Sequence, residues 1–532
     1  MIATCTKLIR RWPISPAIPQ YLTPPVASGA DKLHKGDAHN DNFTMMQYFE
    51  WYCPAGGVHW KRYADDVEHL RDVGITACWL PPPTKGSSPE GTGYDIYDLW
   101  DLGEFDQKGA KGTKWGTKEE MLAGVKKAHE AGIITYIDAV LNHKGGADKT
   151  EEFMATMVDQ DNRNKTVGEM HNIQGWTKFT FPGRGDEYSK LKWNFNHFTG
   201  VDYDDKTKTK AIYKIQGNGK SWARDVDNEH GSYDYLMFAD IDHHHPEVQE
   251  DLNNWGDWVL KETGAFGFRF DAVKHISRDF IGQFVKHIRR EDGGHPSAFC
   301  VGEFWKDSAK ALGEYLDGLG TQFSVFDTPL QGNFKEAGDG KEHYDLRKIF
   351  DGSLVQARPV DAVTLVDNHD TQIGQALQNW VPAWFKPLAY SLILLRPDGY
   401  PCVFFGDMYG CEGENPQPAV AQLGDIIRAR KLFAYGDLVD HWDHPNCVAW
   451  LRKGDDHHDG CVTVICNGTD EGAKRVEVGK EQAGEKWTDL LGWHRAEVTI
   501  GDDGWAEFFS PPQSISIWTK TDARGRNEFK KD

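Results

Sequence analysis

The sequence has 532 residues, with 60 Lys and Arg against 81 Asp and Glu, and a formal net charge of −21. That charge would repel nucleic-acid phosphates and anionic lipid surfaces, so the composition argues against both as partners. A neutral polymer meets no such repulsion, and the 20 Trp residues offer flat apolar faces for sugar rings. The length allows a barrel of about 250 residues with one or two smaller domains.

Residues 1–40 precede the first recognisable strand and are rich in proline. They carry Lys7, Arg10 and Arg11 but no acidic residue before Asp31, and they lack the uninterrupted apolar stretch of a secretory signal. We therefore predict a disordered N-terminal extension and a cytoplasmic protein, with a mitochondrial-type transit segment as the alternative. No apolar run reaches the roughly 18 residues that a membrane-spanning helix needs.

Short apolar runs alternate with amphipathic stretches through the next part of the chain, which is the pattern of βα units around a parallel sheet. Eight such units close into a barrel. The predicted strands are Met45–Trp51, Ile75–Leu80, Ile134–Val140, Gly267–Asp271, Phe299–Gly302, Gln322–Phe326, Ala362–Val366 and Pro401–Phe405. We therefore expect an α/β fold, a (β/α)8 TIM barrel built from residues 41–141 and 246–435.

The third and fourth strands are about 125 residues apart, far more than a βα connection needs. Residues 142–245 are rich in Gly, Asp and aromatic side chains with little helical periodicity, so we predict an inserted irregular β domain after strand 3. Alternating strand patterns over residues 436–520 predict a C-terminal antiparallel β-sandwich, with strands at 447–451, 461–466, 474–478, 496–500 and 515–519. Residues 521–532 form a polar tail.

The cysteine count also informs the fold. There are nine cysteines, an odd number, and several lie inside apolar strand-like runs, such as Cys78, Cys300, Cys402 and Cys466. This distribution favours buried free thiols over a framework of disulfides.

Four of the predicted strands end in polar clusters. They are Asp138–His143, Arg269–His275, Glu303–Trp305 and Asp367–Asp370. A barrel of this kind carries its active site at the C-terminal ends of its strands. Charged groups at the edge of an apolar strand cost desolvation free energy, which proteins tolerate mainly where the charges are used. The clusters therefore predict one shared site.

The carboxylates of these clusters suit three roles: a nucleophile, a proton donor and a stabiliser of positive charge. The two-residue period of a strand puts Arg269 and Asp271 on one face, where we expect the guanidinium to depress the pKa of Asp271 and suit it to a nucleophilic role. Glu303 lies among aromatic residues that would raise its pKa, as a proton donor requires. Asp370 could stabilise an oxocarbenium-like transition state. A carboxyl separation of about 5–5.5 Å would give retention of configuration, and about 6.5–9.5 Å inversion.

Each cluster alone has a structural explanation, such as an ion pair, but the four in this order resemble the four hallmark motifs of the α-amylase family of glycoside hydrolases. The segments Gly93–Phe105, Tyr233–Asp242 and Trp384–Tyr390 are similar to the bacterial liquefying α-amylases in particular. The resemblance covers roughly residues 43 to 520. It implies Asp271 as nucleophile, Glu303 as general acid/base and Asp370 as transition-state stabiliser, and it implies sugar contacts from Trp51, Tyr94, His143, Arg269, Lys274, Trp305 and His369.

The same resemblance implies a structural calcium ion between barrel and insert. Its ligands would be Asn142, Asp234, Asp240 and the backbone carbonyl of His275, and oxygen ligands suit this hard cation. The sequence departs from the liquefying enzymes where they hold further metals, because it has Ala223, His244 and Thr199 at the aligned positions and keeps only Asp242. We therefore expect one firmly bound Ca2+ rather than a cluster.

The leading prediction is endo-hydrolysis of α-1,4-glucosidic bonds in starch, glycogen or maltooligosaccharides by a retaining double displacement, carried out by a monomer. A second hypothesis keeps the fold but transfers the glycosyl group to a sugar acceptor, as a 4-α-glucanotransferase does. A third is a non-catalytic glucan-binding protein. The sequence does not reveal the product profile or the preferred chain length.

Overall fold

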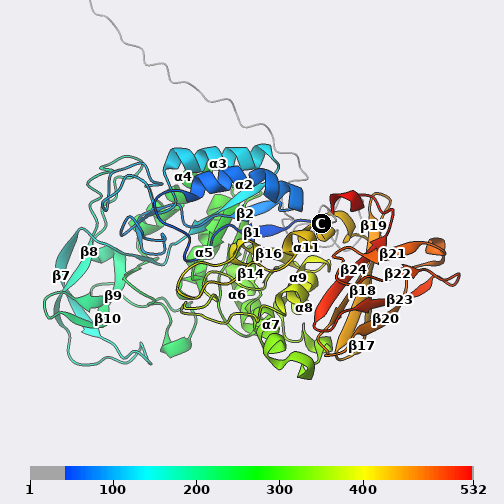
Figure 1. The fold of residues 1–532 in the computed structure, drawn as a ribbon. Helices are drawn as coiled ribbons and strands as arrows, with labels where there is room; N and C mark the ends of the chain where they lie inside the picture. Colours follow the sequence, from blue (N-terminus) through cyan, green and yellow to red (C-terminus); the bar gives the residue numbers. More distant parts are fainter. Residues whose placement is uncertain (1–41, 530–532) are drawn as a thin grey trace, which may run out of the picture.

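The computed structural model describes residues 42–529, so the predictions made for residues 1–40 and for the end of the tail lie outside the described residues. Three parts follow one another along the long axis of the molecule in Figure 1: the insert at one end, the barrel in the middle and the C-terminal sheets at the other end. No helix within residues 42–529 is both long and apolar enough to cross a membrane.

Eight parallel strands close into the predicted barrel, in the order β1-β16-β15-β14-β13-β12-β5-β2. They are β1 (Met45–Gln47), β2 (Ala77–Trp79), β5 (Ile134–Ala139), β12 (Gly267–Phe270), β13 (Phe299–Gly302), β14 (Ser324–Phe326), β15 (Ala362–Leu365) and β16 (Tyr400–Phe404). Each coincides with one of the strands predicted from the sequence. The (β/α)8 architecture is thereby confirmed.

The helices of the described chain surround this barrel (Figure 1). They are α2 (His59–Val73), α3 (Lys118–Glu130), α4 (Pro246–Thr263), α5 (Arg278–Ile288), α6 (Ala309–Leu319), α7 (Thr328–Gly340), α8 (Leu354–Ala357), α9 (Lys386–Leu394), α10 (Phe405–Tyr409) and α11 (Leu423–Phe433). Local signals set their ends. Thr117 and Glu120 form a capping box at the start of α3, and α2 stops at Gly74, which adopts the left-handed conformation at φ 113°.

The insert after β5 is a six-stranded antiparallel sheet in the order β6-β11-β9-β10-β7-β8. Its strands are β6 (His143–Lys144), β7 (Lys149–Met157), β8 (His171–Lys178), β9 (Phe198–Asp204), β10 (Thr209–Ile215) and β11 (Ala239–Ile241). The expected irregular domain is thus more regular than its sequence indicated. β11 returns to pair with β6, so both ends of the insert lie together at the barrel.

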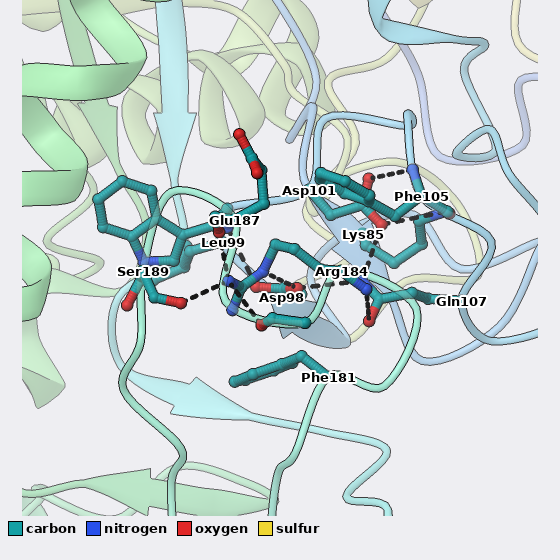
Figure 2. Close-up of polar contacts among 12 residues, drawn as sticks. Lys85, Asp98, Leu99, Asp101, Phe105, Gln107, Phe181, Arg184, Glu187 and Ser189 are labelled. Atoms are coloured by element: carbon teal, nitrogen blue, oxygen red, sulfur yellow. Dashed lines mark hydrogen bonds and ion pairs between the residues drawn. The ribbon is translucent and has the colours of Figure 1, made fainter. Parts of the chain in front are cut away.

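A buried polar network joins the insert to the barrel loop that carries β3 (Lys85–Gly86) and β4 (Ile96–Asp98) (Figure 2). Arg184 of the insert donates from Nε to Asp98 Oδ2 at 2.7 Å, and both side chains are almost wholly buried. Gln107 bridges Asp98 and Asp101 at 3.0 and 2.9 Å. Lys85 is also buried, 3.4 Å from Asp101.

The C-terminal part consists of a six-stranded antiparallel sheet, β17-β18-β19-β24-β21-β22, and a two-stranded sheet, β20-β23. The strands are β17 (Leu438–His444), β18 (Cys447–Gly454), β19 (Asp459–Cys466), β20 (Gly472–Glu477), β21 (Lys486–Asp489), β22 (Glu497–Thr499), β23 (Trp505–Ser510) and β24 (Ser514–Lys520). Side chains of both sheets share one buried cluster that includes Val464, Trp487, Phe508 and Trp518, as expected of a sandwich.

Candidate active site

A single buried guanidinium gathers the acidic residues at the C-terminal ends of the barrel strands. Arg269 on β12 has no exposed surface. Its Nη1 donates to Asp138 Oδ1 and to Asp271 Oδ1, each at 2.8 Å, and its Nη2 donates to Glu303 Oε2 at 2.7 Å. Asp370 completes the group, since it is hydrogen-bonded to Glu303. The structure therefore brings together the three carboxylates that the sequence analysis singled out.

Backbone geometry contributes to the same arrangement. Asp271 and Glu303 directly follow β12 and β13, which are hydrogen-bonded neighbours in the barrel. Ala272 adopts the left-handed conformation, φ 50° and ψ 38°, which is uncommon for a residue with a side chain. This conformation turns the Ala272 N–H toward Glu303 Oε2 at 3.3 Å. Local strain at this turn thus helps to fix the Glu303 carboxylate.

Asp138 was quoted in the third motif but received no role from the sequence. In the structure it accepts hydrogen bonds from Arg269, from the Tyr94 hydroxyl at 2.7 Å and from Trp79 Nε1 at 2.9 Å. It therefore positions a cation and an aromatic ring at once. The available signal was a carboxylate in the interior of an otherwise apolar strand, Ile134–Ala139.

Three of the predicted sugar-contacting side chains stack on one another. The Tyr94 and His369 rings lie parallel with centroids 5.0 Å apart, and Trp51 lies parallel to both at 6.1 Å. Gln47 holds His369 through a hydrogen bond to Nδ1 at 2.9 Å. Trp51 and Tyr94 are only half-buried, so the stack presents aromatic surface beside the carboxylates.

The remaining predicted sugar contacts occupy different positions. His143 is buried and bonds through Nε2 to the Tyr94 carbonyl at 2.7 Å. Lys274 and Trp305 are half-buried, and Lys274 Nζ donates to the Trp305 carbonyl at 3.1 Å and to Glu229 at 3.2 Å. His143 therefore belongs to the base of the site, whereas Lys274 and Trp305 belong to its rim.

Burial dominates the protonation of this group. It raises the pKa of Asp271 well above its ordinary value, against the lowering effect of Arg269, and the neighbouring Glu303 raises it further. Burial also raises the pKa of Asp370 to about 6 and lowers the pKa of His369 to about 3, which leaves that imidazole neutral. The expected depression of the Asp271 pKa is thus wrong. One guanidinium cannot offset the desolvation and mutual repulsion of several carboxylates.

A second buried ion cluster holds the loop that carries Asp370. Lys386 at the start of α9 places its Nζ 2.9 Å from Asp367 Oδ2 and also forms an ion pair with Asp407. Asp367 in turn accepts from the Thr371 hydroxyl at 2.8 Å, and its other oxygen accepts from the Val381 N–H at 3.2 Å. These contacts fix the loop on both sides of its catalytic candidate.

The groups expected to bind calcium lie where the insert leaves and rejoins the barrel. Ile241 N–H donates to the Asn142 carbonyl at 2.9 Å, which places Asn142 beside Asp240 on β11. Burial, followed by the charge of Asp234, raises the pKa of Asp240, and burial raises the pKa of Asp234 to about 7.

The Asn142 Oδ1 atom is a buried acceptor with no hydrogen-bond partner among residues 42–529. The His275 ring bonds to the carbonyl of Tyr233, which directly precedes Asp234, at 2.7 Å. Clustered oxygens of this kind fit a hard cation.

Residues around this group account for the departures noted in the sequence. Lys220 Nζ lies 2.6 Å from Asp242 Oδ2, so an ammonium already neutralises that carboxylate. Thr199 donates its hydroxyl to Asp240, and Ala223 donates its N–H to Asp234 at 3.0 Å. The side chain of His244 is largely exposed. These contacts leave the two buried aspartates as the available carboxylate ligands.

A separate cluster, His197, His245 and Glu247, has ligand atoms within 4.8 Å of one another. Its hydrogen bonds do not suit a metal. The Asn194 N–H donates to His197 Nδ1 at 3.1 Å, so in the neutral imidazole the proton sits on Nε2, which faces Glu247 at 3.3 Å. A ring nitrogen that carries a proton has no lone pair for a cation.

Known proteins match this chain along almost its whole length. A family model described as alpha amylase, catalytic domain, matches residues 57–458, and one described as alpha-amylase C-terminal matches residues 462–519. The chain is 46% identical over 488 residues to an alpha-amylase of Bacillus licheniformis, covering 91% of this chain and 94% of the relative. It is 41% identical over 490 residues to the cytoplasmic alpha-amylase of Escherichia coli (strain K12), covering 90% and 98%.

Solved structures show the same fold at low sequence identity. The alpha-amylase of Geobacillus thermoleovorans, complexed with acarbose, superposes with a TM-score of 0.57 at 20% identity, covering 91% of this chain and 96% of that one. Alpha-amylase I of Eisenia fetida, complexed with maltohexaose, gives 0.60 at 15%, covering 89% and 96%. Together with the matched domains and the relatives above, these findings establish that the chain belongs to the α-amylase family of glycoside hydrolases.

Proposed function

We propose that this enzyme cleaves internal α-1,4-glucosidic bonds of starch, glycogen or maltooligosaccharides by a retaining double displacement. The observation that carries the proposal is the convergence of Asp271, Glu303 and Asp370 around Arg269. Relatives named alpha-amylase at 46% and 41% identity support the substrate class.

In the first step, Glu303 protonates the glycosidic oxygen while Asp271, in its ionised carboxylate form, attacks the anomeric carbon. The bond to the leaving sugar breaks, and the substrate becomes covalently attached to Asp271. In the second step, Glu303 removes a proton from water as that water attacks the same carbon, which releases Asp271. Asp370 and the ring of His369 would hold sugar hydroxyls and stabilise the positive charge that develops on the sugar.

The hydrogen bonds of Arg269 support retention. Asp271 and Glu303 accept hydrogen bonds from the two terminal nitrogens of the same guanidinium, which holds their carboxylates close together, and a short carboxyl separation is characteristic of retaining enzymes. The stack formed by Trp51, Tyr94 and His369 would provide a platform for the sugar next to the bond that breaks. Lys274 and Trp305 would contact neighbouring sugars at the rim.

We also propose one structural Ca2+ held by Asn142, Asp234, Asp240 and the carbonyl of His275. The unpartnered Asn142 oxygen and the two buried aspartates support this ligand set. The ion would neutralise the two carboxylates and cross-link the insert to the barrel. Its role would be structural, because the proposed catalytic steps use only His369 and members of the Arg269 group, which consists of Arg269, Asp138, Asp271, Glu303 and Asp370.

A cytoplasmic location is part of the proposal, supported by the relative from Escherichia coli that is named a cytoplasmic alpha-amylase. The proposal requires only a monomer, because one chain supplies every member of the Arg269 group.

Replacing Glu303 by Gln tests the proposed reaction. The variant should lose at least about a hundredfold in activity on starch, because it removes the proton donor and changes the size of the side chain little. Glu314→Gln on the exposed surface of α6 is the matched control and should retain normal activity. Near-normal activity of Glu303→Gln would refute the assignment.

Incubation of the wild-type enzyme with pure maltoheptaose separates hydrolysis from glycosyl transfer. The proposal predicts only products shorter than the substrate at early times. Products longer than maltoheptaose would support the glucanotransferase alternative.

A further inference from the structure

Two cysteines of the C-terminal sheet face each other across neighbouring strands. Cys447 begins β18 and Cys466 ends β19, and the two are direct partners in the antiparallel register. Both are buried, with 6% and 2% of their surface exposed, and each thiol shifts the pKa of the other. Both thiols are free in the structure.

The hydrogen-bond pattern of the ladder defines how close their backbones are. Asn467 N–H donates to the Asn446 carbonyl at 3.1 Å, so the pair next to the two cysteines is a hydrogen-bonded one. Pairs alternate along an antiparallel ladder, which makes Cys447 and Cys466 a non-hydrogen-bonded pair with Cα atoms about 4.5 Å apart. A disulfide requires a Cα separation of about 4.4–6.8 Å, so the pair meets this requirement without backbone movement.

The neighbouring strand leaves room for the two sulfur atoms. Gly472 at the start of β20 lies over them, and a Cβ placed there would come within 2.7 Å of Cys447 Sγ and 3.2 Å of Cys466 Sγ. Any larger residue at this position would press on the thiols. The Cys466 thiol also donates to the Asp470 carbonyl at 3.4 Å, which orients it within this space.

We propose that Cys447 and Cys466 form a thiol-modification site, at which a peroxide small enough to reach buried sulfur, such as hydrogen peroxide, oxidises the pair to a cross-strand disulfide. The Cys466 thiolate attacks one oxygen of hydrogen peroxide, the O–O bond breaks, and Cys466 becomes a sulfenic acid as hydroxide leaves and takes up a proton. Cys447 then loses its proton and attacks Cys466 Sγ, which breaks the S–O bond and releases a second water. Two protein thiols are oxidised and one hydrogen peroxide is reduced to two waters, so electrons and atoms balance.

The environment of the pair favours this order of attack. Interaction with the Cys447 thiol, together with backbone N–H groups, lowers the pKa of Cys466 to about 7, and the same interaction raises the pKa of Cys447. A substantial fraction of Cys466 is therefore the nucleophilic thiolate near neutral pH.

The bond would form at a corner that fastens the sandwich to the barrel. Asn446 donates its amide to the Glu342 carbonyl at 2.6 Å, and Asn467 donates to the carbonyls of Lys341 and Tyr344 at 2.7 and 2.8 Å. Both asparagines are direct neighbours of the cysteine pair. A covalent link between the strands would restrict the unfolded chain and stabilise this corner, without touching the Arg269 group.

The test compares the full-length protein with single variants after native incubation in hydrogen peroxide. Wild type should lose two titratable thiols, and peptide mapping by mass spectrometry should join the peptide with Cys447 to the one with Cys466. Cys461→Ser is the matched control: Cys461 is buried in the same strand as Cys466 but bonds to the Phe433 carbonyl, and this variant should still form the link. Cys447→Ser should stop at a sulfenic acid on Cys466, seen as the mass of one added oxygen, and Cys466→Ser should form no link.

Oxidised wild type should also melt about 2 °C or more above the reduced protein, with unchanged starch activity. Retention of both thiols by folded wild type, or a link between other cysteines, would overturn the proposal. Either result would leave the catalytic assignment intact, because the wild-type thiol measurement does not depend on turnover.

Discussion

Arg269 carries one positive charge and is surrounded by Asp138, Asp271, Glu303 and Asp370. This excess of buried negative charge explains why burial and repulsion, rather than the adjacent cation, set the pKa of Asp271. A site of this composition is unfavourable for the folded state when all its carboxylates are ionised. Catalytic geometry is thus maintained at the expense of stability near neutral pH.

Asp370→Asn should reveal this cost. The pKa of Asp370 is about 6 in the folded protein, against 3.8 for an ordinary aspartate as in the unfolded chain. The folded protein therefore binds this proton more tightly, and the free energy of unfolding falls as the pH rises from about 4 to 6. At pH 7.5 the variant should be more stable than wild type by up to about 3 kcal/mol, and the difference should shrink toward pH 4.5. Melting temperatures at the two pH values measure this, with exposed Asp502→Asn as the control. A variant that is less stable at pH 7.5 would contradict it.

The identity of the catalytic carboxylates could be predicted from the sequence, but the role of Asp138 and the pKa of Asp271 could not. The three carboxylates were identified because each follows an apolar strand. The role of Asp138 was missed, since its partners Tyr94 and Trp79 are distant in sequence. The Asp271 pKa was mispredicted because the two-residue period reveals its neighbour Arg269 but not how many other carboxylates share that cation.

At the scale of elements, the connection between insert and barrel depends on buried polar contacts. Arg184 is enclosed by Asp98 and by the carbonyls of Glu187 and Ser189 at 2.6 and 2.8 Å, and its guanidinium lies over the Phe181 ring (Figure 2). A charge so deeply buried is tolerable only while every partner is in place.

Arg184→Met should therefore destabilise the protein by about 3–5 kcal/mol, because it leaves the Asp98 carboxylate buried without its cation. Urea unfolding would measure the loss, and limited proteolysis should show faster cleavage within the insert. Lys310→Met on the exposed face of α6 removes a solvent-exposed ion pair. It should change neither the stability in urea nor the rate of proteolysis of the insert. Unchanged stability of Arg184→Met would show that the network does not hold the insert.

Strand patterns were easiest to recognise where both faces are buried. All barrel strands appear as short apolar runs in the sequence, and all were predicted. The insert strand β7 has a mixture of exposed and buried residues, and its sequence KTEEFMATM gave no clear alternation. In the C-terminal sheets, β17 and β21 were missed because most of their residues are polar. The strand β23 was missed because Trp505 and Phe509 are apolar although they lie on its less buried face, which hides the alternation.

Across the whole molecule, the proposed calcium ion would lie between parts of the chain that are far apart in sequence. Asn142 follows β5, whereas His275 follows β12, and the complete insert separates them. Loss of the ion would leave Asp234 and Asp240 repelling each other in a buried site.

Removal of divalent metal with a chelator should therefore lower the melting temperature, and added Ca2+ should restore it, because a ligand that binds only the folded state stabilises it. Asp240→Asn should reduce the size of this calcium-dependent shift. A melting temperature that is the same with chelator and with Ca2+ would count against the site.

In the proposed double displacement, Asp271 attacks the anomeric carbon and Glu303 supplies and then removes the proton, so the configuration at that carbon is retained. Proton NMR of the first products released from a maltooligosaccharide, recorded before mutarotation, reports this configuration. The new reducing ends should appear first in the α configuration of the substrate. First products in the β configuration would rule out the double displacement.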